Sequence, residues 1–175
     1  MNQPGTDNST AFFGRAPVLV LGLGNILLRD DGVGLTLLDQ LQRLRNWGDD
    51  VQFVDGGTRG IALLGFIENR RALLILDAIS LGGEPGTIYA WQGLDGFLGM
   101  PSSPKTAHEG NALQLLQTAH IMGIVPPRIA VVGIAPHELH TGIGLSELVT
   151  NALPSALAQA ESLLFQLQAE SIQAP

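Results

Sequence analysis

Four aspartates and one histidine are the side chains of this sequence best placed to do chemistry. Asp30 and Asp31 precede an apolar-periodic run, Asp55 and Asp77 directly follow apolar runs, and His108 follows a long segment rich in Gly, Pro and Ser. Carboxylate oxygens with a single imidazole nitrogen form a modest site for a borderline divalent metal such as nickel or zinc. Two carboxylates and one histidine would leave coordination positions open for a substrate.

Each of these residues also has an ordinary structural interpretation. Asp30 and Asp31 precede a helical pattern, where capping is the commoner role of an aspartate. Asp55 precedes two glycines, which is typical of a turn residue whose side chain forms a hydrogen bond with the nearby backbone. Asp77 emerges from a buried strand and needs a partner, which is a backbone N–H, a metal or a substrate. His108 lies in a first helical turn, where the neutral, ligand-competent ring is favoured, but a surface histidine is the commoner explanation when the residue is taken alone.

Several common catalytic patterns are absent. Gly22 and Gly24 lack the third glycine of a dinucleotide fingerprint, and the sequence has no G-x-x-x-x-G-K-[ST] phosphate loop and no G-x-S-x-G serine elbow. His137 and His140 are three residues apart, not the four of a zincin motif. The sequence has no cysteine, which excludes disulfides, thiolate metal sites and a cysteine nucleophile.

Composition and charge narrow the classes of partner. The 175 residues carry 16 acidic and nine scattered basic side chains, with a net charge of -7, whereas nucleic-acid binding requires clustered Lys and Arg. No apolar run reaches the ~18 residues that suggest a membrane span, and residues 1–15 lack the pattern of a secretory signal. We therefore expect neither a nucleic-acid nor a membrane partner. The absence of cysteine fits a cytoplasmic protein, which we expect to be a monomer.

Apolar patterning predicts the elements that must position the aspartates. We expect strands at about 17–22, 51–54, 72–76, 87–91 and 128–134, and helices at about 33–45, 60–69, 106–122 and 146–170. The connection 78–86 is too short for a helical crossover, so strand 87–91 is expected to lie antiparallel to strand 72–76. A single domain, 16–175, would follow a loose extension, 1–15.

The order of these elements predicts an α/β fold. It is a three-layer sandwich, in which a mostly parallel, mixed β-sheet of about five strands has helices on both faces. Ligands of open α/β sheets bind beyond the carboxyl ends of the strands. Asp30 or Asp31, Asp55 and Asp77 follow three such strand ends, and the long loop before His108 could reach the same edge.

The sequence resembles the hydrogenase maturation endopeptidases from about Val18 to Leu167. The shared motifs, in order, are Gly22-Leu-Gly-Asn25 with Asp30-Asp-Gly-Val-Gly34, Asp55-Gly-Gly-Thr58, Leu76-Asp-Ala78, His108 after a Pro-containing loop, and Val132-Gly-Ile through Gly144-Leu-Ser146. Members of that family remove a C-terminal extension from the large subunit of nickel-iron hydrogenases. The resemblance implies the same fold over nearly the whole domain and an aspartic-type peptidase acting on a large-subunit precursor.

The resemblance also implies roles for individual residues. Asp31, Asp77 and His108 would be metal ligands, and Asp55 would join Asp31 and Asp77 as a catalytic carboxylate. The first ligand is often Glu in the family, so Asp30 stays open as an alternative to Asp31. Nickel is expected to arrive with the precursor and not to be permanently bound.

The resemblance leaves the bond-breaking step open. Either a metal polarises the carbonyl or activates water, or a carboxylate such as Asp55 acts as a base while nickel serves only as an anchor. The main alternative function is a non-enzymatic metal-binding or chaperone module for hydrogenase assembly. A small nucleotide-binding α/β protein is a further alternative, which the missing phosphate fingerprint disfavours.

Overall fold

The computed structural model describes residues 15–95 and 112–172, with side chains through residue 169. The strands are β1 (Val18–Leu23), β2 (Val51–Gly57), β3 (Ala72–Ala78), β4 (Ile88–Gln92) and β5 (Arg128–Ile134). The helices are η1 (Arg29–Gly32), α1 (Val33–Arg43), η2 (Gly60–Leu63), α2 (Leu64–Ile67), α4 (Ala112–Ile121) and α5 (Glu147–Ile172). The strands form one sheet of order β2-β1-β3-β5-β4, in which only β4 is antiparallel to its neighbour.

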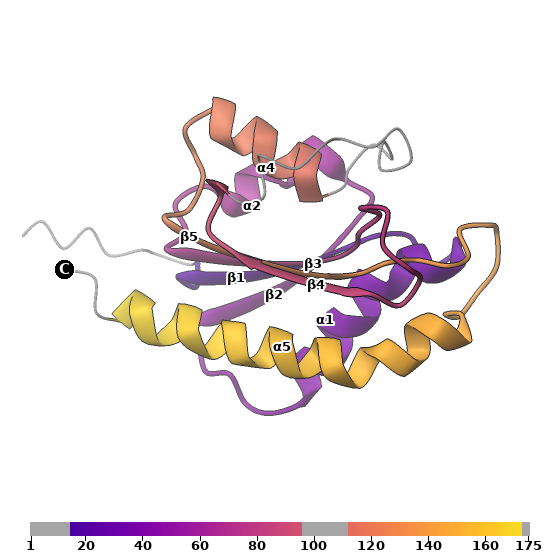
Figure 1. Ribbon diagram of the computed structural model, residues 1–175. Coiled ribbons are helices and arrows are strands. Elements are labelled where there is room, and N and C mark those ends of the chain that lie inside the picture. Colours follow the sequence, from indigo (N-terminus) through magenta and orange to yellow (C-terminus); the bar gives the residue numbers. More distant parts are fainter. Residues whose placement is uncertain (1–14, 96–111, 173–175) are drawn as a thin grey trace, which may run out of the picture.

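Helices cover both faces of this sheet, with α2 and α4 on one side and α1 and α5 on the other (Figure 1). Alternate residues of each inner strand therefore enter two different cores. Val20 and Leu74 pack with α1 and α5, whereas Leu21 and Ile75 pack with α2 and α4. Burial on both faces explains why β1 and β3 are apolar without alternation. The predicted three-layer sandwich is confirmed.

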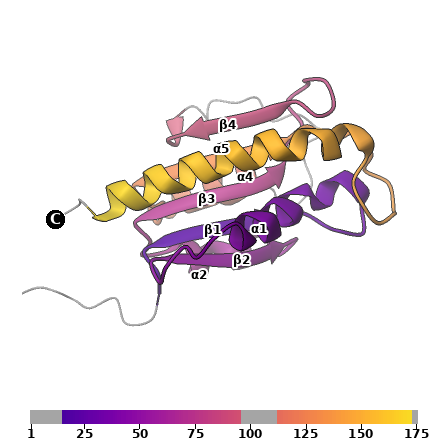
Figure 2. The same cartoon turned by 90° about the horizontal axis from the view of Figure 1, so that it is seen from below.

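Helix α1 lies over β1 and β3, and α5 lies over β3 and β5 (Figure 2). The first turn of α1 is pressed against the sheet at Gly34. A Cβ at Gly34 would collide with the carbonyl oxygens of Leu23 and Leu76, at the carboxyl ends of β1 and β3. This close approach brings the segment just before α1, which contains Asp30 and Asp31, to the edge of the sheet where the site was predicted.

The predicted orientation of strand 87–91 is confirmed. Strand β4 runs antiparallel to β3, as expected, and its partner in the sheet is β5, which lies between them. Burial explains the arrangement, because β5 is buried from Ile129 to Ile134 while β4 is only half-buried. The more apolar strand occupies the interior position, and the more polar one takes the edge.

Other boundaries differ by less. Strand β2 continues past the expected residue 54 to Gly57, so Asp55 lies within a strand and not in a turn. The expected helix 60–69 is a 3-10 turn followed by the four-residue α2. The expected helix 106–122 is described only from Ala112, so His108 and most of the extension 1–15 lie outside the described residues. No helix in the described ranges combines the length and the apolar character that crossing a membrane requires.

Candidate active site

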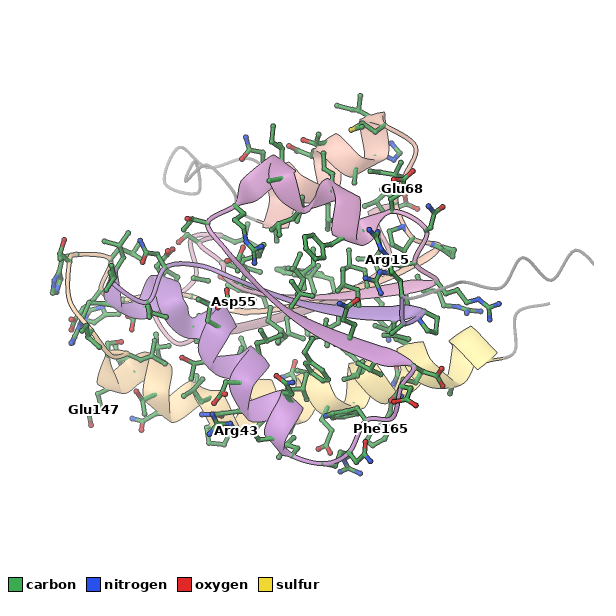
Figure 3. All side chains as sticks on the ribbon, turned by 180° about the vertical axis from the view of Figure 1, so that it is seen from behind. Arg15, Arg43, Asp55, Glu68, Glu147 and Phe165 are labelled. Carbon is green, nitrogen blue, oxygen red and sulfur yellow. The ribbon has the colours of Figure 1, made fainter. Side chains whose placement is uncertain are left out.

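The carboxyl ends of β2, β1 and β3 form the floor of the candidate site. Asp55 of β2 pairs with Gly22 of β1, which pairs on its other side with Leu76 of β3. Asp77 is the next residue of β3, so two of the predicted carboxylates lie at one edge of the sheet. Figure 3 shows Asp55 toward the end of the molecule where α5 begins at Glu147, with Arg15 toward the opposite end.

Asp77 is the buried carboxyl of this edge, with only 4% of its surface exposed. Its Oδ1 accepts a hydrogen bond from the Ala78 N–H at 2.8 Å, and its Oδ2 accepts one from the Ala112 N–H at 2.9 Å. Burial raises its pKa to about 7 against these two hydrogen bonds, and the negative charge of Asp31 adds to the rise. Asp77 can therefore hold or release a proton near neutral pH, which suits an acid, a base or a metal ligand.

Asp31 is half-buried, and its Oδ2 accepts a hydrogen bond from the Asn25 N–H at 2.8 Å. It does not cap α1, because the N-cap residue of that helix is Gly32 and no side chain caps it. Gly24 closes the turn from the other side, with φ at 120°. A Cβ there would collide with the carbonyl oxygen of Asp31, so only glycine allows the turn to close.

The Asp30 side chain points away from Asp31 and Asp77 and is fully buried. Its Oδ2 accepts hydrogen bonds from the N–H groups of His137 at 2.9 Å and Glu138 at 2.8 Å, and from the Ser146 hydroxyl at 2.8 Å. Its Oδ1 accepts one from the Ser146 N–H at 2.6 Å. Burial raises the pKa of Asp30, but the hydrogen bonds from Glu138, Ser146 and His137 outweigh it, so the pKa lies below its ordinary value.

Further contacts join the turn before Asp30 to the loop between β5 and α5. Arg29 pairs with Glu138 at 2.8 Å, and its Nη1 donates to the Ile143 carbonyl at 3.1 Å. The Arg29 backbone is left-handed, with φ at 52°, and its N–H donates to the Gly142 carbonyl at 3.1 Å. A left-handed conformation is strained for a side chain of this size, so these contacts hold the backbone in an otherwise unfavourable state.

The structure thus brings Asp31 close enough to Asp77 to perturb its titration and places the exposed Asp55 on the same sheet edge. Residues 15–95 and 112–172 contain no group of three or more His, Asp or Glu side chains arranged to hold a metal ion. The third predicted ligand, His108, lies outside these ranges.

Comparison with known proteins decides the family. A family model described as hydrogenase maturation protease matches residues 35–163. This chain belongs to that family. The hydrogenase 2 maturation protease of Escherichia coli is 33% identical over 156 residues, which cover 89% of this chain and 94% of that protein.

Solved structures agree with this assignment. The hydrogenase maturating endopeptidase HybD from E. coli superposes with a TM-score of 0.75 at 32% identity, over 85% of this chain and 92% of that one. The [NiFe] hydrogenase maturation protease HybD from Thermococcus kodakarensis gives 0.66 at 25% identity, over 84% and 98%. The chain is therefore a peptidase of hydrogenase maturation, and the carboxylate edge is its candidate active site.

The sequence does not show Ser146 of this maturation protease as a partner of Asp30. Ser146 was expected to begin the last helix and ends the last motif shared with the family, and in the structure its N–H and hydroxyl both donate to Asp30. The two residues are 116 positions apart, so no local pattern connects them. The signals in the sequence were the two adjacent aspartates where one ligand was needed and the place of Ser146 at the end of a motif shared with the family.

Proposed function

We propose that this protease removes the C-terminal extension of a nickel-iron hydrogenase large-subunit precursor after nickel insertion, and that it recognises the bound nickel. Its partner is then the precursor itself, and the protease works as a cytoplasmic monomer. Family membership supports the peptidase activity. The observation that carries the nickel-reading part is the buried Asp77 carboxyl beside Asp31.

The chemistry of these two carboxyls suits a metal that is presented by another protein. Each oxygen of Asp77 accepts a hydrogen bond from a backbone N–H, and a carboxylate oxygen can accept a second partner. A cation would replace the proton that Asp77 retains near neutral pH, because a positive charge favours the ionised carboxylate. We propose His108 as the nitrogen ligand that completes the set.

Two assignments of the hydrolytic step are compatible with this site. In one, the substrate's nickel polarises the scissile carbonyl or activates water. In the other, nickel only anchors the precursor, while Asp55 takes a proton from water as the water oxygen attacks the carbonyl carbon. The exposure of Asp55 at the end of β2 supports the second assignment, because an exposed carboxylate is accessible to both water and a peptide.

Incubation with nickel-loaded and nickel-free precursor tests the proposal. Mass spectrometry monitors release of the C-terminal peptide. We expect the peptide to be released from the nickel-loaded precursor only. Cleavage of both forms at equal rates would refute nickel recognition. Tight binding without any released peptide would favour the non-enzymatic assembly module instead.

The Asp77→Asn variant tests the site directly. We expect it to lose processing while its circular dichroism stays native, because the amide cannot supply an anionic ligand. Asp39→Asn is the matched control, since Asp39 forms an exposed pair with Arg43 on α1. Unchanged processing by Asp77→Asn would remove Asp77 from the site.

A further inference from the structure

We propose that Asp30 is a positioning residue that fixes Asp31 in the site. The inference rests on the proposed role of Asp31, and the geometry that supports it is independent of any metal. We use the term Asp30 clamp for the hydrogen bonds that His137, Glu138 and Ser146 donate to the Asp30 carboxylate.

The Asp30 clamp supplies the hydrogen bonds that offset the free-energy cost of burying the Asp30 carboxylate. Asp30 is fully buried, and a buried charge without partners is strongly unfavourable. Three backbone N–H groups and one hydroxyl converge on it, all from the segment 137–146. Ser146 also accepts from the Val149 N–H at 3.4 Å at the start of α5, so the clamp ties the turn before α1 to the first turn of the longest helix.

The clamp restricts Asp31 through the backbone that the two residues share. Both lie in η1, where Asp30 turns into the protein and Asp31 turns back to the Asn25 N–H. The left-handed Arg29 precedes them, and the Asp30 N–H donates to the Glu138 carbonyl at 3.0 Å. With Asp30 fixed on one side and Asn25 on the other, the Asp31 carboxylate has little freedom to leave the vicinity of Asp77.

The rest of the two loops reinforces this arrangement. Leu28 forms an isolated bridge with Gly142, and the Gly142 N–H donates to the Leu27 carbonyl at 2.9 Å. These are backbone contacts that do not use the Asp30 side chain, so we expect a variant of the clamp to keep its fold while Asp31 becomes less precisely placed. Outer hydrogen bonds that orient a ligand or a catalytic group typically contribute 10- to 100-fold to affinity or activity.

The test compares Asp30→Asn, Ser146→Ala and Ser146→Thr with the wild-type protein. The Asn25 amide signal in a ¹H–¹⁵N spectrum reports the hydrogen bond to Asp31 without any metal or substrate. We expect that signal to shift, and its hydrogen exchange to accelerate, in Asp30→Asn and Ser146→Ala. Ser146→Thr keeps the hydroxyl and should restore it. The kcat/KM for precursor processing should fall about 10- to 100-fold in the first two variants.

Controls separate this inference from the proposed function. If Asp30→Asn does not fold, the milder Ser146→Ala still decides the outcome, because all three N–H donors remain. An unmoved Asn25 signal in folded clamp variants would overturn the inference, and so would a shifted signal with unchanged processing. If Asp31→Asn processes precursor as well as the wild type does, the proposed role of Asp31 fails and the positioning role fails with it, whatever the Asn25 signal shows.

Discussion

Replacing Asp77 with Asn should change how the stability of the protein depends on pH. Burial raises the pKa of Asp77 from 3.8 to about 7 in the folded state. Below pH 3.8 both states hold the proton, so the group has no effect. Between pH 3.8 and 7 the unfolded chain releases the proton while the folded state keeps it, and stability falls by about 1.4 kcal/mol per pH unit. The full loss is about 4 kcal/mol above pH 7.

Asp77→Asn removes this titration but has its own cost. One side of the amide presents an NH₂ group to the N–H of Ala78 or Ala112, so one hydrogen bond is lost at a cost of about 1–3 kcal/mol. That cost does not depend on pH. Relative to the variant, the wild type should therefore lose about 2.5 kcal/mol of unfolding free energy between pH 5 and pH 8.

Urea unfolding of both proteins at pH 5, 6, 7 and 8 measures this difference, provided that the m-values stay equal. Asp31→Asn adds a check on the cause, because the charge of Asp31 contributes to the raised pKa of Asp77. In that variant the pH-dependent loss should be smaller and should end at lower pH. A stability difference between wild type and Asp77→Asn that is the same at pH 5 and pH 8 would refute the raised pKa and the buried environment behind it.

Two further substitutions test the turn and the proposed base. Gly24→Ala should lower the free energy of unfolding by more than the ~1–3 kcal/mol of a left-handed backbone alone, because its Cβ also meets the carbonyl of Asp31. Gly82→Ala is the matched control, with φ at 84° and open space around the Cβ position; equal losses in urea unfolding would contradict the predicted collision. Asp55→Asn should lower the processing rate by about 10²- to 10⁴-fold if Asp55 is a general base, while a pull-down still recovers the nickel-loaded precursor. Processing at the wild-type rate would leave the bond-breaking step to the metal.

The fold was largely predictable because burial on two faces leaves an unmistakable pattern. Strands β1, β3 and β5 each contain an unbroken apolar run, and their predicted positions agree with the structure within two residues. The position of β4 was not predictable from its own residues. Its neighbour β5 follows it in the chain, and the choice between the edge and the interior depends on how apolar the two strands are relative to each other.

The site was predictable to a smaller extent. The rule that ligands bind at the carboxyl ends of strands placed Asp55 and Asp77 on one edge, which the strand register confirms. The sequence could not show which of Asp30 and Asp31 is buried and which faces the site. Both are aspartates in the same turn, and only the fold brings Ser146 to Asp30. The roles of Asp31, Asp77 and His108 as metal ligands stay predictions.

The distance along the chain that the Asp30 clamp spans has a consequence for biosynthesis. Asp30 cannot acquire its partners until Ser146, 116 residues later, has left the ribosome. At about 5–20 residues per second, the turn with the two aspartates waits on the order of ten seconds before it can be fixed. The early half of the nascent chain already contains Asp31, Asp55 and Asp77, yet an incomplete chain cannot hold the first of them in place. Activity should therefore begin only when the last strand and helix have been made, so a truncated product would not act on precursors prematurely.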